Sequence, residues 1–237
     1  MVTQPPAPHT VEADTTAQLV GTTLDGEARG VLVRAEALAT TPMLRAAIST
    51  DAKTLTDMAA DKDVVFPHDA NDTIEVLQST ATGRASMLRI PADAPPSTAP
   101  PPGVARVEQR GDRLVAIADA PITSSTTNAV AGEVVLTALI DLAPMRARPF
   151  TQLTGVTLTG FKTPVLIGGG AAPAAGEPVT AKVITTVAKA PALEVSGVVA
   201  LPPTITKPQE FVFPAQLGCG VFAFLMLIGF GISLRRR

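Results

Sequence analysis

The apolar positions in the first part of the chain follow a helical period. Leu24, Ala28, Val31, Ala35 and Leu38 recur at spacings of four, three, four and three residues, which places them on one stripe of a helix. We therefore predict a long amphipathic helix over residues 11–39. The first ten residues, which contain three prolines, are predicted to be a flexible lead-in.

Two shorter helices are predicted to complete a helical region over residues 11–62. Thr41 before Pro42 suits an N-cap followed by a proline at the first helical position. Thr50 or Asp51 can cap a third helix, in which Leu55 shares a face with two later apolar residues.

After residue 63 the pattern changes to short runs rich in β-branched residues and separated by turn residues, which indicates strands of an antiparallel sheet. The runs are residues 73–78, 85–90, 104–109, 113–118 and 133–140. Gly111 and Asp112 suit a tight reversal, so residues 104–118 are predicted to form a hairpin. Residues 91–103, rich in proline and small residues, are predicted to be an exposed loop.

Four later apolar runs extend the β character to about residue 201. They cover residues 153–161, 165–168, 179–187 and 193–201, with loops predicted at 168–173 and 176–178. Periodicity does not decide whether they add to the first sheet or form a second one. The predicted fold class is α+β, with a long N-terminal helix packed on an antiparallel sheet over residues 73–201.

The last apolar segment has the length of a transmembrane helix. Residues 211–234 carry no charge and are followed by the basic stub 235–237, which is three arginines. About twenty predominantly apolar residues suffice to cross a bilayer. The positive-inside rule then places the C-terminus in the cytoplasm and residues 1–210 on the other side of the membrane, with the lipid bilayer as a partner. A tail anchor with a cytoplasmic body is the competing topology, and it puts the arginines on the wrong side.

The N-terminus does not carry the export signal that this topology requires. The first 25 residues have neither a basic start nor an apolar stretch of signal-peptide length. We therefore expect the chain to be part of a longer receptor, with another transmembrane helix before Met1 and a cytoplasmic output domain after Arg237.

Composition and motifs argue against several classes of function. A net charge of -2 gives no positive field for nucleic acid. The only cysteine, Cys219, lies in the apolar segment, so the body of the chain has no disulfide and no cysteine-based zinc site. The two histidines, His9 and His68, lie in no recognisable catalytic frame. We therefore expect no enzyme activity, no catalytic residues, no metal and no cofactor.

The layout of the chain resembles the Cache class of bacterial sensor domains. The resemblance rests on a long helix, the broken helical turn LATTPMLRAAI at residues 38–48, a sheet and a returning membrane span. The runs LVAIADAPI at 114–122 and GEVVLTALIDL at 132–142 resemble the paired central strands of that class. Over residues 24–142 the resemblance implies a PAS-like antiparallel sheet backed by the long helix, and ligand sensing for a transmembrane receptor. It also implies a bacterial inner-membrane location, with residues 1–210 in the periplasm.

Arg89 and Asp119 are the candidate ligand-binding residues, because each interrupts an apolar run of a predicted strand. The alternative is that each faces water or pairs with another charge. A homodimer that forms through the long helix is a further alternative, although packing of that helix on its own sheet explains the same stripe. The rival functions are an envelope structural or assembly protein that binds another protein through its sheet, and an enzyme, which would need an acid and a base in a deep cleft.

Overall fold

A computed structural model describes residues 7–60, 69–98, 100–101, 103–171 and 176–200. Within these ranges, no helix combines the length and the apolar character needed to cross a bilayer. The predicted span 211–234 and the basic stub 235–237 lie outside the described residues. The membrane prediction therefore stays a prediction.

The long helix is α1, Pro8–Ala39, and it ends where the sequence predicts. It begins three residues before the predicted start, because proline is tolerated in the first helical turn, where no N–H partner is lost. The predicted stripe is confirmed, since all five of its residues are at most 1% exposed. That stripe packs on the chain's own sheets, so the stripe itself is not free to pair with a second copy.

The two short helices are α2, Pro42–Ala47, and α3, Ala52–Ala60. Thr41 occupies the N-cap position of α2 without a capping bond, and its hydroxyl donates instead to the Leu38 carbonyl at 2.8 Å. At α3 the cap is Asp51, whose Oδ1 accepts a hydrogen bond from the Thr54 amide at 2.8 Å. All three predicted helices are therefore present.

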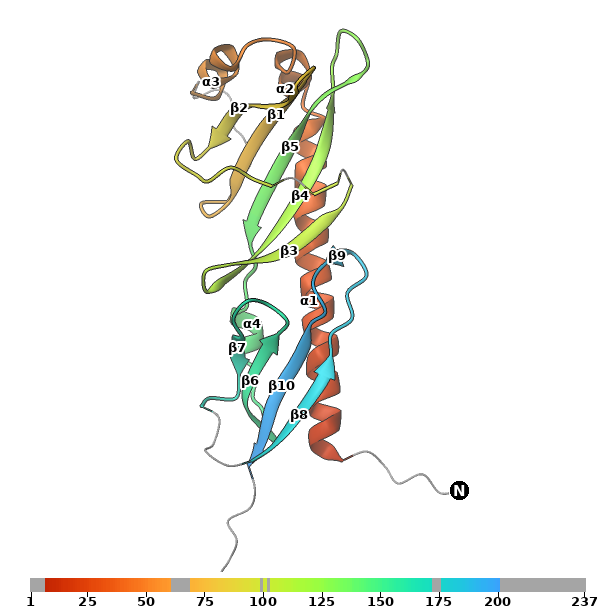
Figure 1. Ribbon diagram of the computed structural model, residues 1–237, viewed down its shortest axis with the longest axis vertical. Coiled ribbons are helices and arrows are strands. Elements are labelled where there is room, and N and C mark those ends of the chain that lie inside the picture. The colour runs from red at the N-terminus through yellow and green to blue at the C-terminus, as the bar shows by residue number, and fades with distance from the viewer. Residues whose placement is uncertain (1–6, 61–68, 99, 102, 172–175, 201–237) are drawn as a thin grey trace, which may run out of the picture. The chain divides into compact units, whose positions relative to one another are not determined.

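The first sheet contains six strands in the order β2-β1-β5-β4-β3-β9 (Figure 1). Its strands are β1 Thr73–Thr80, β2 Gly83–Ile90, β3 Ala105–Arg110, β4 Arg113–Thr123, β5 Val130–Leu139 and β9 Ala188–Lys189. All neighbours are antiparallel except β3 and β9. The predicted hairpin is confirmed, with Arg110 opposite Arg113 and Gly111 at a φ of +65° in the turn.

The later strands form a separate sheet of four, in the order β7-β6-β10-β8. They are β6 Leu153–Thr159, β7 Val165–Gly168, β8 Gly176–Lys182 and β10 Glu194–Ala200, and the short helix α4, Ala143–Arg146, precedes them. The loop predicted at 176–178 was wrong, because these residues begin β8. A proline is tolerated there since β8 is an edge strand.

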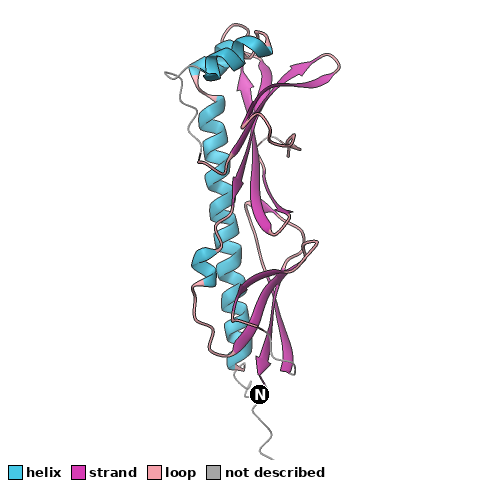
Figure 2. Ribbon diagram, turned by 90° about the vertical axis from the view of Figure 1, so that its left-hand side faces the viewer, coloured by secondary structure: helices cyan, strands magenta, loops and turns pink. Residues whose placement is uncertain are grey.

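Helix α1 contacts both sheets, and Figure 2 shows it running alongside them. Two of its carboxylates hold loops of the second half by their backbone. Glu12 accepts bonds from the amides of residues 151–153 at 2.8–2.9 Å, and Asp25 accepts bonds from the amides of residues 186–188 at 2.7–2.9 Å. The strand predicted over 179–187 ends early, at Lys182, and the amides at the end of the predicted range, from residue 186 on, donate to Asp25 instead.

The first sheet is buried on both faces. One face packs on α1, chiefly through β4 and β5, with buried residues such as Ala118 and Leu136. The opposite face carries a smaller apolar cluster of Leu77, Val115, Ile117 and Val135. The candidate site lies on this second face.

Candidate functional site

The second face of the first sheet is covered by the segment 91–103, called the strap here, of which residues 99 and 102 are not described. The Ser97 amide donates to Glu75 at 2.6 Å, and the Gly103 amide donates to the Asp119 carbonyl at 3.2 Å. Arg89 and Arg106 donate to strap carbonyls at 3.2 and 2.8 Å. The predicted exposed loop is therefore exposed on its outer side, but it is fastened to four strands of the sheet.

Strand register brings the two predicted ligand-binding residues to one row of this face. Arg89 lies opposite Glu75, Glu75 lies opposite Val135, and Val135 lies opposite Asp119. Residues opposite each other in a sheet share a face. Three strand spacings separate Arg89 from Asp119, which is about 14 Å, so the two residues occupy opposite ends of the row.

At one end of the row, Arg89 forms an ion pair with Glu75 at 2.7 Å. Glu75 is 2% exposed and also accepts hydrogen bonds from Ser86 and from the Ser97 amide. Burial by itself raises the pKa of Glu75, but the hydrogen bonds from Arg89, Ser97 and Ser86 outweigh burial, so the pKa lies below its ordinary value. Arg89 therefore pairs with another charge, and its role in ligand binding stays a prediction.

A cavity of about 440 Å³ opens between this end of the row and the strap. Its walls combine charged and hydroxyl groups with two apolar residues. It is lined by Glu75, Leu77, Arg84, Ser86, Arg89, Pro96, Ser97 and Thr98. The cavity, called the strap pocket below, has the size and the few polar groups that suit a small ligand.

At the other end of the row, Asp119 is 0% exposed. Among the described residues, neither of its carboxylate oxygens has a hydrogen-bond partner. Burial raises the pKa of Asp119 to about 7, and the adjacent carboxyl of Glu133 adds to the rise. Glu133 itself is 7% exposed and forms an ion pair with Arg84 at 2.8 Å.

Asp119 does not line the strap pocket, but Glu133 connects the two. Glu133 lies opposite Leu77 in the sheet, and its ion-pair partner is Arg84. Both Leu77 and Arg84 line the pocket. Glu133 is thus next to the pocket, on the strand beyond its floor, and Asp119 lies one strand further, on β4.

Sequence reasoning missed the acidic partners Glu75 and Glu133. The signal was available, since each interrupts an apolar run of a strand as Arg89 and Asp119 do. What the sequence did not provide was the register between strands, which decides which charges meet.

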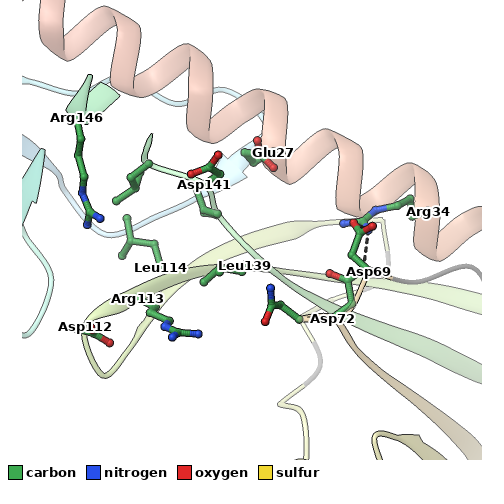
Figure 3. Close-up of a pocket in the computed structure, with 13 residues that line it drawn as sticks. Glu27, Arg34, Asp69, Asp72, Asp112, Arg113, Leu114, Leu139, Asp141 and Arg146 are labelled. Carbon is green, nitrogen blue, oxygen red and sulfur yellow. Dashed lines mark hydrogen bonds and ion pairs between the residues drawn. The ribbon is translucent and has the colours of Figure 1, made fainter. Parts of the chain in front are cut away.

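A second cavity, of about 630 Å³, lies between α1, the β3–β4 turn and the segment after β5 (Figure 3). Glu27 and Arg34 line it from α1, and Arg146 lines it from α4. Asp72 is 4% exposed, but Arg34 pairs with it at 2.6 Å and the Asp69 amide donates to it at 3.0 Å. Because this buried carboxylate already has its partners, the second cavity is the weaker candidate.

No protein-family model and no curated protein matched the chain in the comparisons made. A long helix on antiparallel sheets also occurs outside the Cache class, so the architecture does not identify that class by itself. The strap pocket is therefore the candidate site on geometric grounds. Within the described residues, no group of three or more acidic, histidine or cysteine side chains is arranged to hold a metal ion.

Proposed function

We propose that the chain is the extracytoplasmic ligand-sensing module of a bacterial transmembrane signalling receptor, and that its ligand binds in the strap pocket. In this proposal residues 1–210 lie in the periplasm, and residues 211–234 span the inner membrane. The observation that carries the proposal is a cavity of about 440 Å³ between a sheet and a strap that is fastened by charged side chains. Binding, without catalysis, is its activity.

The fastening of the strap supports a sensing role. Glu75 and Arg89 line the pocket, and the same two side chains hold the strap through Ser97 and Ala94. A ligand that contacts either side chain changes the contacts of the strap. Such a ligand shifts the balance between two strap arrangements by its different affinity for them.

Helix α1 supplies a physical route from the pocket towards the rest of the chain. It packs on the face of the first sheet opposite the strap, and its residues Glu12 and Asp25 hold the second half of the body. In the proposal, a small rearrangement of the first sheet moves α1 and the second sheet together. The strand order β2-β1-β5-β4-β3 is compatible with the PAS-like sheet that the sequence resemblance implies.

A thermal-shift screen of the full 237-residue chain in mild detergent, against a broad set of small metabolites, tests the proposal. A ligand that binds only the folded state raises the unfolding midpoint in a concentration-dependent way. Ser86→Leu, which places a bulky side chain in the pocket, should abolish the shift. Ser79→Leu, on an exposed position of the neighbouring strand β1, should retain it.

A flat response from folded protein over the whole set would overturn the sensing proposal. The rival function would then be favoured, that of an envelope assembly protein that binds another protein through its sheet. A shift that survives Ser86→Leu unchanged would place the ligand outside the strap pocket.

A further inference from the structure

The charged groups that line the strap pocket are already matched. Glu75 and Arg89 form an ion pair at 2.7 Å, and Glu75 accepts two further hydrogen bonds from neighbouring residues. Arg84 pairs at 2.8 Å with Glu133, which lies next to the pocket. Two arginines are thus balanced by two carboxylates, and the pocket carries no surplus of either charge.

This balance disfavours a charged ligand. A cation would have to take Glu75 from Arg89, and an anion would have to take an arginine from its carboxylate. The two carboxylates are only 2% and 7% exposed, for Glu75 and Glu133 respectively, so the loss of a partner would leave a buried charge uncompensated, which is costly. A neutral ligand leaves both ion pairs in place.

The remaining polar groups of the lining are the hydroxyls of Ser86, Ser97 and Thr98. Ser86 donates its proton to Glu75, so its oxygen is left as an acceptor. The Ser97 hydroxyl is buried and has no partner among the described residues. A serine side chain has three staggered rotamers, so this hydroxyl can change its direction without a change in the backbone. Hydroxyls both donate and accept, and therefore match the hydroxyl groups of a ligand.

The apolar part of the lining is small and aliphatic. It consists of Leu77 and Pro96, and no aromatic residue is among the described residues that line the pocket. A flat aromatic ligand would find no ring to stack on. The volume of about 440 Å³ lies towards the small end of ligand pockets, which run from about 300 to 1,000 Å³. The lining therefore suits a short aliphatic carbon chain or ring that carries polar groups.

We propose that the ligand of the strap pocket is a small neutral polyhydroxy compound, such as a sugar alcohol or a monosaccharide. This inference rests on the proposed sensing function and specifies its ligand class. The hydroxyls of the ligand exchange hydrogen bonds with Ser86, Ser97 and Thr98, and its C–H groups pack on Leu77 and Pro96. Both ion pairs stay formed when the ligand binds.

Matched probes on the full chain test the ligand class by thermal shift. Each set contains a neutral polyol of four to six carbons, with the acid and the amine in which a carboxylate or an aminomethyl group replaces one terminal hydroxymethyl group. Sorbitol, gluconate and glucamine are one such set. Millimolar concentrations and equal ionic strength keep the general stabilisation by excluded polyols small.

At least one polyol should raise the unfolding midpoint in a concentration-dependent way, with an apparent affinity about tenfold above those of its acid and its amine. An equal or stronger response to the acid or the amine would overturn the neutral-ligand proposal and leave the sensing function standing. If no compound of any set binds, the neutral-ligand proposal fails, and the metabolite screen with Ser86→Leu still decides the sensing function.

Removal of one hydroxyl tests the site. Ser97→Ala keeps the backbone amide that donates to Glu75 and removes only the hydroxyl. It should weaken the polyol response about fivefold in apparent affinity, which is the effect of one lost hydrogen bond. Ser125→Ala, at an exposed serine between β4 and β5, is the matched control and should leave the response unchanged. Equal responses of the two variants would overturn the assignment to the strap pocket.

A change of ligand preference gives a readout that a merely structural role would not produce. Glu133→Gln removes the carboxylate that balances Arg84 and leaves a surplus positive charge at the pocket. This variant should bind the acid of a set about tenfold more tightly than the native chain does, without a matching gain for the polyol. Glu108→Gln removes the partner of Arg106, which does not line the pocket, and should leave the preference unchanged. If Glu133→Gln keeps the native preference, the charge balance does not select the ligand and the proposal is wrong.

Discussion

The environment of Asp119 has a consequence for stability that does not depend on any ligand. Its pKa is raised from 3.8 to about 7 in the folded state, so the folded chain binds a proton that the unfolded chain has released. The free energy of unfolding should therefore fall as the pH rises from about 4 to about 7. Urea denaturation of native protein and of Asp119→Asn at pH 5 and pH 8 measures this. The decrease in unfolding free energy between pH 5 and pH 8 should be smaller in Asp119→Asn than in the native protein. The same decrease in both proteins would contradict the raised pKa.

Two glycines of α1 provide a matched pair of probes for its packing. A Cβ on Gly21 would collide with the backbone of Ile184, whereas a Cβ on Gly26 would meet nothing within 4 Å. Gly21→Ala should destabilise the fold by about 1–3 kcal/mol, because the loop after β8 must move away. Gly26→Ala should be neutral or stabilise by up to about 1 kcal/mol, because alanine favours the helix. Chemical denaturation checks both, and equal effects would contradict the close approach at Gly21.

The backbone contacts of Asp25 act at the scale of whole elements. Its carboxylate accepts bonds from three consecutive amides and from the Thr186 hydroxyl, and it thereby fixes α1 to the segment between β8 and β9. Burial alone would raise the pKa of Asp25, but these hydrogen bonds lower it to about 2. The stabilisation is thus present above pH 4 and is lost as the pH falls towards 2.

Removal of this carboxylate should loosen the connection without unfolding the first sheet. Asp25→Ala should lower the free energy of unfolding by about 1–3 kcal/mol. It should also speed amide hydrogen exchange at residues 186–188. Asp14→Ala, on the exposed face of the same helix, is the control. Unchanged exchange at residues 186–188 in Asp25→Ala would show that Asp25 does not hold this segment.

Local signals predicted most of the elements. The three helices, the hairpin and the first five strands follow from apolar period, caps and turn residues, which act over a few positions. The separate second sheet and the strand at Gly176 did not follow, because pairing with β10 decides them. Arg89 and Asp119 were found as charges in apolar runs, but their partners Glu75 and Glu133 depend on register across the sheet. Non-local pairing of this kind leaves little trace in one sequence.

At the scale of the whole chain, the predicted membrane anchor is open to a direct test. Residues 211–234 should hold the protein in the membrane fraction through extraction with alkaline carbonate. The double substitution Leu225→Lys and Met226→Lys should release the protein. Each lysine raises the free energy of membrane insertion by about 2.5–3.5 kcal/mol at the centre of a span. Leu166→Lys, at an exposed position of β7, should have no effect. Retention of the double variant in the membrane would contradict the predicted span.

The central claim of the proposed sensing function is that a ligand binds beneath the strap. Hydrogen exchange measured by mass spectrometry tests it most directly, with the full chain and the compound that gives the largest thermal shift. A ligand beneath the strap should slow amide exchange in residues 94–98, where the Ser97 amide donates to Glu75, and at Gly103. Slower exchange confined to the residues around the second cavity, with the strap unchanged, would contradict it.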